Sequence, residues 1–163
     1  MKIAILGLGL IGGSLARALH ARTPHRVVGL DADGAVLQRA LADGVIAAGA
    51  QREADMAALL ADCDALLVAL YPGAAVEAVE RLATALAPGT LVVDCCGVKR
   101  PVCAALEPLA ARHGFSFLGG HPMAGRERFG YDHSLETLFD GASMILTPTA
   151  ATASDALARA KAL

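Results

Sequence analysis

The chain has 163 residues and a formal net charge of −2, a length that suits one domain with one sizeable core. It has no basic run longer than Lys99-Arg100 and no uninterrupted apolar stretch of about 18 residues, so the sequence favours neither nucleic acid nor a membrane as a partner. Hydrophobic residues make up 55% of the chain and aromatic residues only 4%, which favours a core of Ala, Leu and Val in parallel strands and packed helices.

The four cysteines, at positions 63, 95, 96 and 103, form no Cys-x-x-Cys pair and have no histidine nearby at metal-ligand spacing. We therefore expect neither a metal site nor a disulfide framework, but reduced thiols in a cytoplasmic protein. Lys2 precedes an apolar run, as in a secretory signal peptide, but glycines interrupt that run and a polar-faced helix follows it. We therefore interpret it as part of the folded domain.

The first predicted elements surround a glycine-rich stretch. Residues 3–6 have the pattern of a short buried strand, residues 7–12 read Gly-Leu-Gly-Leu-Ile-Gly, and residues 14–19 have a helical pattern. A strand, a glycine turn and a helix in this order are typical of a dinucleotide-binding unit.

Each glycine of this stretch has a separate expected role. Gly7 can take the tight turn, Gly9 leaves room for a pyrophosphate, and Gly12 lets the helix lie close to the strand. The start of the helix would face the phosphates with free amide hydrogens and the positive end of its dipole, and Leu10 and Ile11 of the turn are further candidate contacts to the cofactor.

An acidic residue follows the second predicted strand, which spans 27–31. Asp31 lies 19 residues after Gly12, close to the spacing at which an acid accepts hydrogen bonds from the adenosine ribose. No Arg or Lys lies between Asp31 and Gln38 to compensate a 2′-phosphate, so the sequence favours NAD over NADP. Alternatively, Asp31 merely caps the helix that begins near Asp33.

The rest of the chain alternates strands and helices. Further strands are predicted at 45–48, 64–70, 90–94, 115–118 and 143–146, and further helices at 33–41, 55–61, 75–86, 101–113 and 152–163. Pro72 fits the first turn of its helix, whereas Pro108 should kink or split the helix that contains it. The pattern predicts an α/β fold with a doubly wound, mostly parallel sheet of the Rossmann type.

We assign residues 1–150 to this dinucleotide-binding domain. Residues 151–163 have a helical pattern without a stop signal, which predicts the start of a helix that leads to a part absent from this chain. A small domain with a frayed tail is the alternative.

Ligands bind beyond the carboxyl ends of the strands in such sheets, so the strand exits are candidate sites. Leu70 and Tyr71 should run under the nicotinamide ribose, although Tyr71 could equally be a packing residue. His121 follows Gly119-Gly120, which allows close approach to a ligand, and precedes Pro122, which stiffens the turn. A neutral imidazole there could take the proton of a substrate hydroxyl as hydride leaves the same carbon; a structural histidine is the alternative.

Four segments together resemble a known family. Residues 7–16, residues 94–99 and above all the segment 119–127, Gly-Gly-His-Pro-Met-Ala-Gly-Arg-Glu, with Leu-Phe-Asp-Gly-Ala at 138–142, closely resemble the N-terminal domain of prephenate dehydrogenases, enzymes of tyrosine biosynthesis. The resemblance implies NAD-dependent oxidative decarboxylation of prephenate to 4-hydroxyphenylpyruvate. His121 matches the family histidine that takes the hydroxyl proton. Glu127 matches an acid of a polar gate, with a plain surface role as the alternative.

One position departs from the family pattern. Many members have Gly-Ser-Val-Lys after the fifth strand, whereas this chain has Cys96-Gly97-Val98-Lys99, so Gly97 offers no hydroxyl at the position of the serine. Cys96, a water or a backbone amide would have to replace that contact at the substrate, or the rate suffers. Lys99 matches a family lysine that we interpret as structural.

The resemblance also implies a helical domain, absent here, that forms a homodimer and supplies arginine to the substrate carboxylates. Arginines 100, 126 and 128 of this chain are left unassigned. Three alternatives remain for the function: arogenate specificity, a non-catalytic NAD-binding or regulatory module, and another NAD enzyme such as a β-hydroxyacid dehydrogenase.

Overall fold

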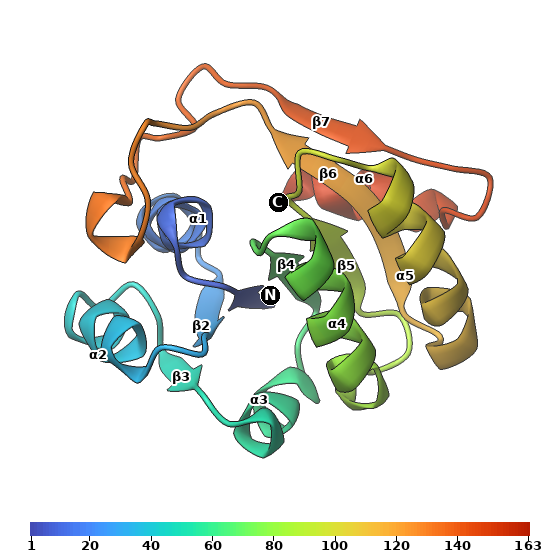
Figure 1. Ribbon diagram of the computed structural model, residues 1–163, viewed down its shortest axis with the longest axis horizontal. Helices are drawn as coiled ribbons and strands as arrows, with labels where there is room; N and C mark the ends of the chain where they lie inside the picture. Colours follow the sequence, from blue (N-terminus) through green and yellow to red (C-terminus); the bar gives the residue numbers. More distant parts are fainter.

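A computed structural model describes all residues, 1–163, and contains one seven-stranded sheet with helices on both faces (Figure 1). The strand order is β3-β2-β1-β4-β5-β6-β7; all neighbours are parallel except β7, which is antiparallel to β6. The strands are β1 (Lys2–Leu6), β2 (Arg26–Leu30), β3 (Ala48–Ala50), β4 (Ala65–Val68), β5 (Leu91–Asp94), β6 (Ser116–Pro122) and β7 (Met144–Thr147). The helices are α1 (Leu10–Arg22), α2 (Gly34–Ala42), α3 (Glu53–Leu60), α4 (Pro72–Leu82), α5 (Arg100–His113) and α6 (Ser154–Ala162), with short 3₁₀ turns η1 (Ala83–Ala85) and η2 (Tyr131–His133).

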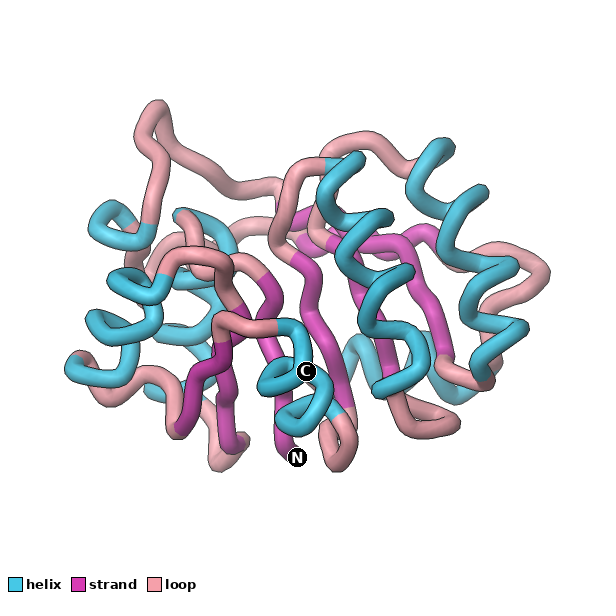
Figure 2. The backbone as a smooth tube through the Cα atoms, turned by 60° about the horizontal axis from the view of Figure 1, so that its bottom comes forward, coloured by secondary structure: helices cyan, strands magenta, loops and turns pink.

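The sheet is covered on both faces, so its strands are apolar on both sides. In β1, Ala4 and Leu6 face a core that includes α3, α4 and α5, whereas Ile3 and Ile5 face a core that includes α1, α2 and α6. Figure 2 shows these helices on the two sides of the strands. The predicted doubly wound, mostly parallel sheet is confirmed. No helix is long and apolar enough to span a bilayer.

Helix α1 begins at Leu10, four residues earlier than predicted. Gly9 is its N-cap, and the amide of Gly13 donates to the carbonyl of Gly9 at 2.8 Å. The glycines at the start of the helix have low helix propensity, so the sequence pattern did not indicate its first turn.

Two other elements differ from the prediction. Strand β3 lies at 48–50 instead of 45–48, because Val45 and Ile46 are buried in the turn that precedes it. Helix α5 continues through Pro108 without splitting, since the φ angle that proline fixes is itself helical.

Strand β6 is longer than predicted and extends to Pro122. Its last four residues pair with the antiparallel strand β7, with His121 opposite Ile145. His121 therefore lies within a strand, whereas the sequence placed it in the loop after one.

The last helix, α6, packs on the face that also carries α1 and α2. Ala156 is fully buried, and the Arg159 guanidinium donates to the carbonyls of Gly89 at 2.7 Å and Asp64 at 2.9 Å. Residues 154–162 thus belong to this helical layer, although the sequence assigned only residues 1–150 to the domain. A further domain beyond α6 stays a prediction.

Candidate functional site

Two adjoining cavities lie at the carboxyl edge of the sheet. The larger, of about 530 Å³, is bounded by the glycine turn, the exits of β4 and β5, and residues 128–130. The smaller, of about 340 Å³, lies between the ends of β1 and β2 and helices α3 and α4. Gly7, Asp31 and Leu70 line both, so the two cavities meet at the glycine turn.

The three glycines of the turn have different surroundings. Gly7 has a φ of +87°, and a Cβ on it would lie 2.7 Å from the carbonyl oxygen of Ala69. A Cβ on Gly12 would lie 1.8 Å from the carbonyl oxygen of Gly7, so only glycine lets α1 approach β1 this closely. A Cβ on Gly9 would have no atom within 4 Å, which leaves open space above the turn.

Asp31 holds the glycine turn with its carboxylate. Its Oδ2 accepts the amide hydrogen of Leu8 at 2.6 Å, and its Oδ1 accepts that of Asp33 at 2.9 Å. The N-cap of α2 is Asp33, whose own carboxylate accepts from the amide of Ala35 at 2.8 Å. The alternative in which Asp31 serves only as a helix cap is therefore wrong, and Asp31 lies where the cavities meet.

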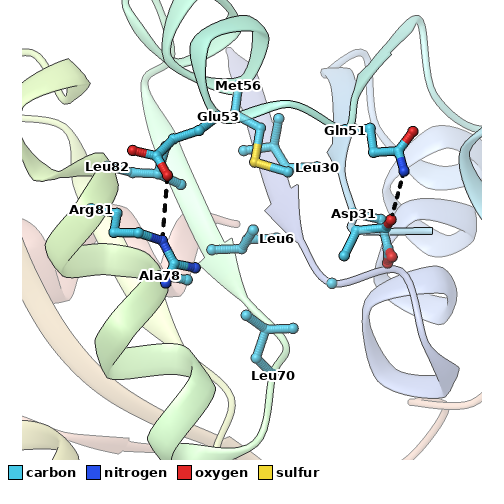
Figure 3. A pocket seen from close by; sticks show the side chains of 12 residues that line it. Leu6, Leu30, Asp31, Gln51, Glu53, Met56, Leu70, Ala78, Arg81 and Leu82 are labelled. Atoms are coloured by element: carbon cyan, nitrogen blue, oxygen red, sulfur yellow. Dashed lines mark hydrogen bonds and ion pairs between the residues drawn. The ribbon is translucent and has the colours of Figure 1, made fainter. Parts of the chain in front are cut away.

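The smaller cavity has an apolar floor and polar sides (Figure 3). On one side lie Asp31 and Gln51, whose Nε2 donates to the carbonyl of Ala32 at 2.9 Å. On the other side, Arg81 pairs with Glu53, with 3.4 Å between Nε and Oε2. The apolar floor consists of Leu6, Leu30, Met56, Leu70, Ala78 and Leu82. The sequence pattern gave no signal for these residues, since the packing of α3 against α4 brings Glu53 and Arg81 together and a bond to the Ala32 carbonyl positions Gln51.

A buried carboxylate joins the exits of β5 and β6. Asp94 has no exposed surface, and its oxygens accept the amide hydrogens of Cys96 at 3.1 Å and Gly120 at 3.2 Å. The Lys99 ammonium pairs with Asp94 and also donates to the carbonyl of Gly120. This network fixes the position of Gly97, in the loop after β5, relative to the end of β6.

His121 lies beside Gly97, a residue that lines the larger cavity. A Cβ on Gly97 would be 3.5 Å from Cε1 of the imidazole and would have no other atom within 4 Å. The ring is half-buried, and its Nδ1 is buried without a hydrogen-bond partner. A side chain at Gly97 would therefore contact the imidazole of His121.

The thiols near this site stay protonated at neutral pH. Burial, reinforced by the charge of Asp94, raises the pKa of Cys96 to about 11 and that of Cys95 to about 12. The Cys96 thiol lies 3.4 Å from the carbonyl oxygen of Leu70. No group of three or more His, Cys, Asp or Glu side chains is arranged to hold a metal ion.

Exposed aromatic side chains border the larger cavity. Tyr71 is 85% exposed and Phe129 is 87% exposed, so neither side chain packs inside this domain, and the contact of Tyr71 with a cofactor stays a prediction. Arg128 also lines this cavity, although the sequence left it unassigned. Glu127 is exposed on the same segment without lining either cavity.

The segment 123–130 crosses from the end of β6 to the start of η2, beside α1 (Figure 1). At its far end the Tyr131 hydroxyl donates to Asp43 at 2.9 Å, and the Arg17 guanidinium lies 4.8 Å from the ring centroid. The Leu135 amide donates to the hydroxyl of Ser14 in α1 at 2.9 Å. These contacts hold residues 128–130 at the cavity.

The strand order, the glycine turn before α1 and the acid after β2 define this chain as a dinucleotide-binding domain of the Rossmann type. The family model described as "Prephenate dehydrogenase, nucleotide-binding domain" matches residues 15–163. The chain therefore belongs to the prephenate dehydrogenase family, within its nucleotide-binding domain.

Individual relatives agree with this assignment. The prephenate dehydrogenase of Bacillus subtilis is 31% identical over 163 residues, which are 99% of this chain and 43% of that protein. The crystal structure of Aquifex aeolicus prephenate dehydrogenase with hydroxyphenyl propionate and NAD⁺ has a TM-score of 0.91 at 28% identity, over 99% of this chain and 55% of that one. Synechocystis arogenate dehydrogenase has a TM-score of 0.87 at 31% identity, with the same coverage. The chain thus spans about half the length of these relatives.

Proposed function

We propose that this chain is the cofactor-binding part of an NAD-dependent dehydrogenase that oxidatively decarboxylates prephenate to 4-hydroxyphenylpyruvate. The observation that carries the proposal is the position of His121, whose ring lies next to Gly97, a residue that lines the cavity beginning at the glycine turn. The likeness to the Aquifex enzyme, whose structure contains NAD⁺ and a hydroxyphenyl compound, supports it.

The residues around the two cavities fit a dinucleotide. The open space above Gly9 and the free amides of Leu10 and Ile11 at the start of α1 suit a pyrophosphate. The smaller cavity, with Asp31 at its edge, suits the adenosine, and the larger one, with Leu70 and Tyr71, suits the nicotinamide half. When bound, NAD supplies the hydride acceptor.

His121 would handle the proton of the substrate. As hydride leaves the carbon that bears the hydroxyl, the imidazole accepts the hydroxyl proton and a carbonyl forms. The bond to the ring carboxylate then breaks, its electron pair enters the ring, carbon dioxide leaves, and the proton returns to the oxygen as the phenol forms. Aromatisation favours the products, so this chain mainly has to orient the substrate.

Another group must replace, at this step, the serine hydroxyl that is missing at Gly97. The Cys96 thiol donates to the carbonyl oxygen of Leu70 at 3.4 Å and is therefore already engaged. A backbone amide of the β5 exit, or a water in the open space beside Gly97, is therefore the better replacement for the expected serine hydroxyl.

Arogenate is the alternative substrate, and the likeness to the Synechocystis enzyme favours keeping it in the test. Both substrates would present the same ring hydroxyl to His121. Residues beyond this chain would decide between them, in a helical domain that forms a homodimer and binds the substrate carboxylates. We further propose a cytoplasmic location, which suits the four free cysteines.

The test is turnover by the complete natural protein, followed by the absorbance of reduced nicotinamide with prephenate or arogenate as substrate. His121→Asn should lower kcat by about 10²- to 10⁴-fold, because it removes the proton acceptor, with little change in NAD affinity by calorimetry. His20→Asn, at an exposed position of α1, is the matched control. An unaltered kcat in His121→Asn would refute the assigned role, and NAD binding without turnover of either substrate would favour a non-catalytic module.

A further inference from the structure

We propose that the Glu53–Arg81 ion pair is a second determinant of cofactor choice, acting with Asp31 to exclude the 2′-phosphate of NADP. The inference rests on the proposed function, since it takes the smaller cavity as the adenosine site. It assigns a role to two residues that the sequence pattern did not mark.

The charges around the smaller cavity carry the argument. Arg81 is the only cationic residue that lines it, and it comes from the last turn of α4. Its guanidinium pairs with Glu53, the first residue of α3. Asp31 lies on the other side of the cavity with both carboxylate oxygens already hydrogen-bonded (Figure 3). The cavity therefore has two carboxylates and one cation, and that cation is already paired.

This arrangement opposes a phosphate on the ribose. A 2′-phosphate carries about two negative charges and attracts an arginine that can form bidentate hydrogen bonds with it. Glu53 competes for that arginine and adds its own repulsion. NAD has only a hydroxyl at this position, so the ion pair discriminates between the two nucleotides without contacting NAD there.

The size of the effect follows from the exposure of the pair. The side chains of Arg81 and Glu53 are 57% and 59% exposed, so their interactions are screened by water and salt. Across a cavity of this size, removal of one charge should change the affinity for a doubly charged group by about 3- to 10-fold. The pair contributes little to stability for the same reason, so its variants should remain folded.

Helix α3, which carries Glu53, also offers a matched control. Arg52 and Asp55 form a second exposed ion pair, with 2.8 Å between Nε and Oδ2, and neither side chain lines the cavity. Asp55→Asn changes the net charge by the same amount as Glu53→Gln but leaves the cavity unchanged. The two variants separate a local effect from a general effect of charge.

The experiment is calorimetric titration of NAD and NADP into the wild-type protein, Glu53→Gln, Arg81→Gln, the double variant and Asp55→Asn. Glu53→Gln should raise the NADP affinity relative to that of NAD by about 3- to 10-fold, and Arg81→Gln should lower it, since Glu53 then stays unpaired. The gain should disappear in the double variant and shrink at high salt. Asp55→Asn should leave the ratio of the two affinities unchanged.

Two results would overturn the inference while NAD still binds. One is an unchanged ratio of NADP to NAD affinity in Glu53→Gln, and the other is an equal rise of that ratio in Asp55→Asn. A wild-type protein that binds neither nucleotide would instead contradict the proposed function, and the inference would fall with it. Because the readout is binding, the result does not depend on turnover.

Discussion

Replacement of Gly12 by alanine should destabilise the fold, whereas the same replacement at Gly9 should mainly weaken NAD binding. A Cβ at Gly12 would be 1.8 Å from the Gly7 carbonyl oxygen, about 1.6 Å closer than an ordinary contact, and 3.1 Å from the Cβ of Ala69. A backbone oxygen cannot rotate away as a side chain can, so α1 must move off β1. Overpacking costs about 3 kcal/mol and alanine regains about 1 kcal/mol of helix propensity, so the expected net loss is about 2 kcal/mol or more.

Gly9 serves as the control because its surroundings are open. It is the N-cap of α1 with a φ of −66°, which alanine can adopt, and a Cβ there would have no neighbour within 4 Å. The change should cost about 1 kcal/mol of stability or less. The new methyl group would occupy the space that suits the pyrophosphate, so NAD affinity should fall by about tenfold or more.

Urea denaturation followed by circular dichroism gives the free energy of unfolding of each variant, and calorimetry gives its NAD affinity. A Gly12→Ala protein within about 0.5 kcal/mol of wild type would refute the close approach of α1 to the glycine turn. A Gly9→Ala protein that binds NAD as tightly as wild type would refute the position assigned to the pyrophosphate.

Two further predictions concern stability. Lys99→Met should lower the free energy of unfolding by about 3–5 kcal/mol, because Asp94 would be left as a buried carboxylate without its cation. Addition of Asp94→Asn should restore part of this loss. A Lys99→Met protein as stable as wild type in urea denaturation would contradict the reasoning. Stability should also fall as the pH rises from about 9 to about 12. In this range the unfolded chain releases the protons of Cys95 and Tyr131. The folded chain retains them, because burial raises the pKa of each group to about 12. Urea denaturation midpoints, measured across this pH range under a thiol reductant, test the fall in stability. Tyr131→Phe should flatten the upper part of the plot of midpoint against pH. A constant midpoint would show that the phenol and thiol are not buried as described.

The sequence predicted the elements whose signals are local. The glycine turn, the acid at Asp31 and the buried strand that contains residues 65–68 each have a short pattern with a physical cause, and the parallel order follows from the alternation of strands and helices. The start of α1 was missed because Gly12 and Gly13 are chosen for close packing against neighbours and not for helix propensity.

Features that depend on pairing between distant segments were not visible in the sequence. His121 lies in a strand because β7, whose residues are more than 20 positions away, pairs with it, and no local pattern indicates such a partner. Glu53 and Arg81 border a cavity because α3 and α4 pack next to each other. The closeness of Gly97 to His121 follows from the β5–β6 register, in which Asp94 lies opposite Gly119.

The segment 123–130 has a consequence for how a ligand meets the larger cavity. Its ends are fixed, by the Met123 amide bonded to Ser143 at 2.8 Å and by Tyr131 bonded to Asp43, while nearly all of its side chains are exposed. The segment is therefore tied to the rest of the domain at its two ends, while its exposed side chains, Arg128 and Phe129 among them, stay available at the larger cavity to a molecule that binds there.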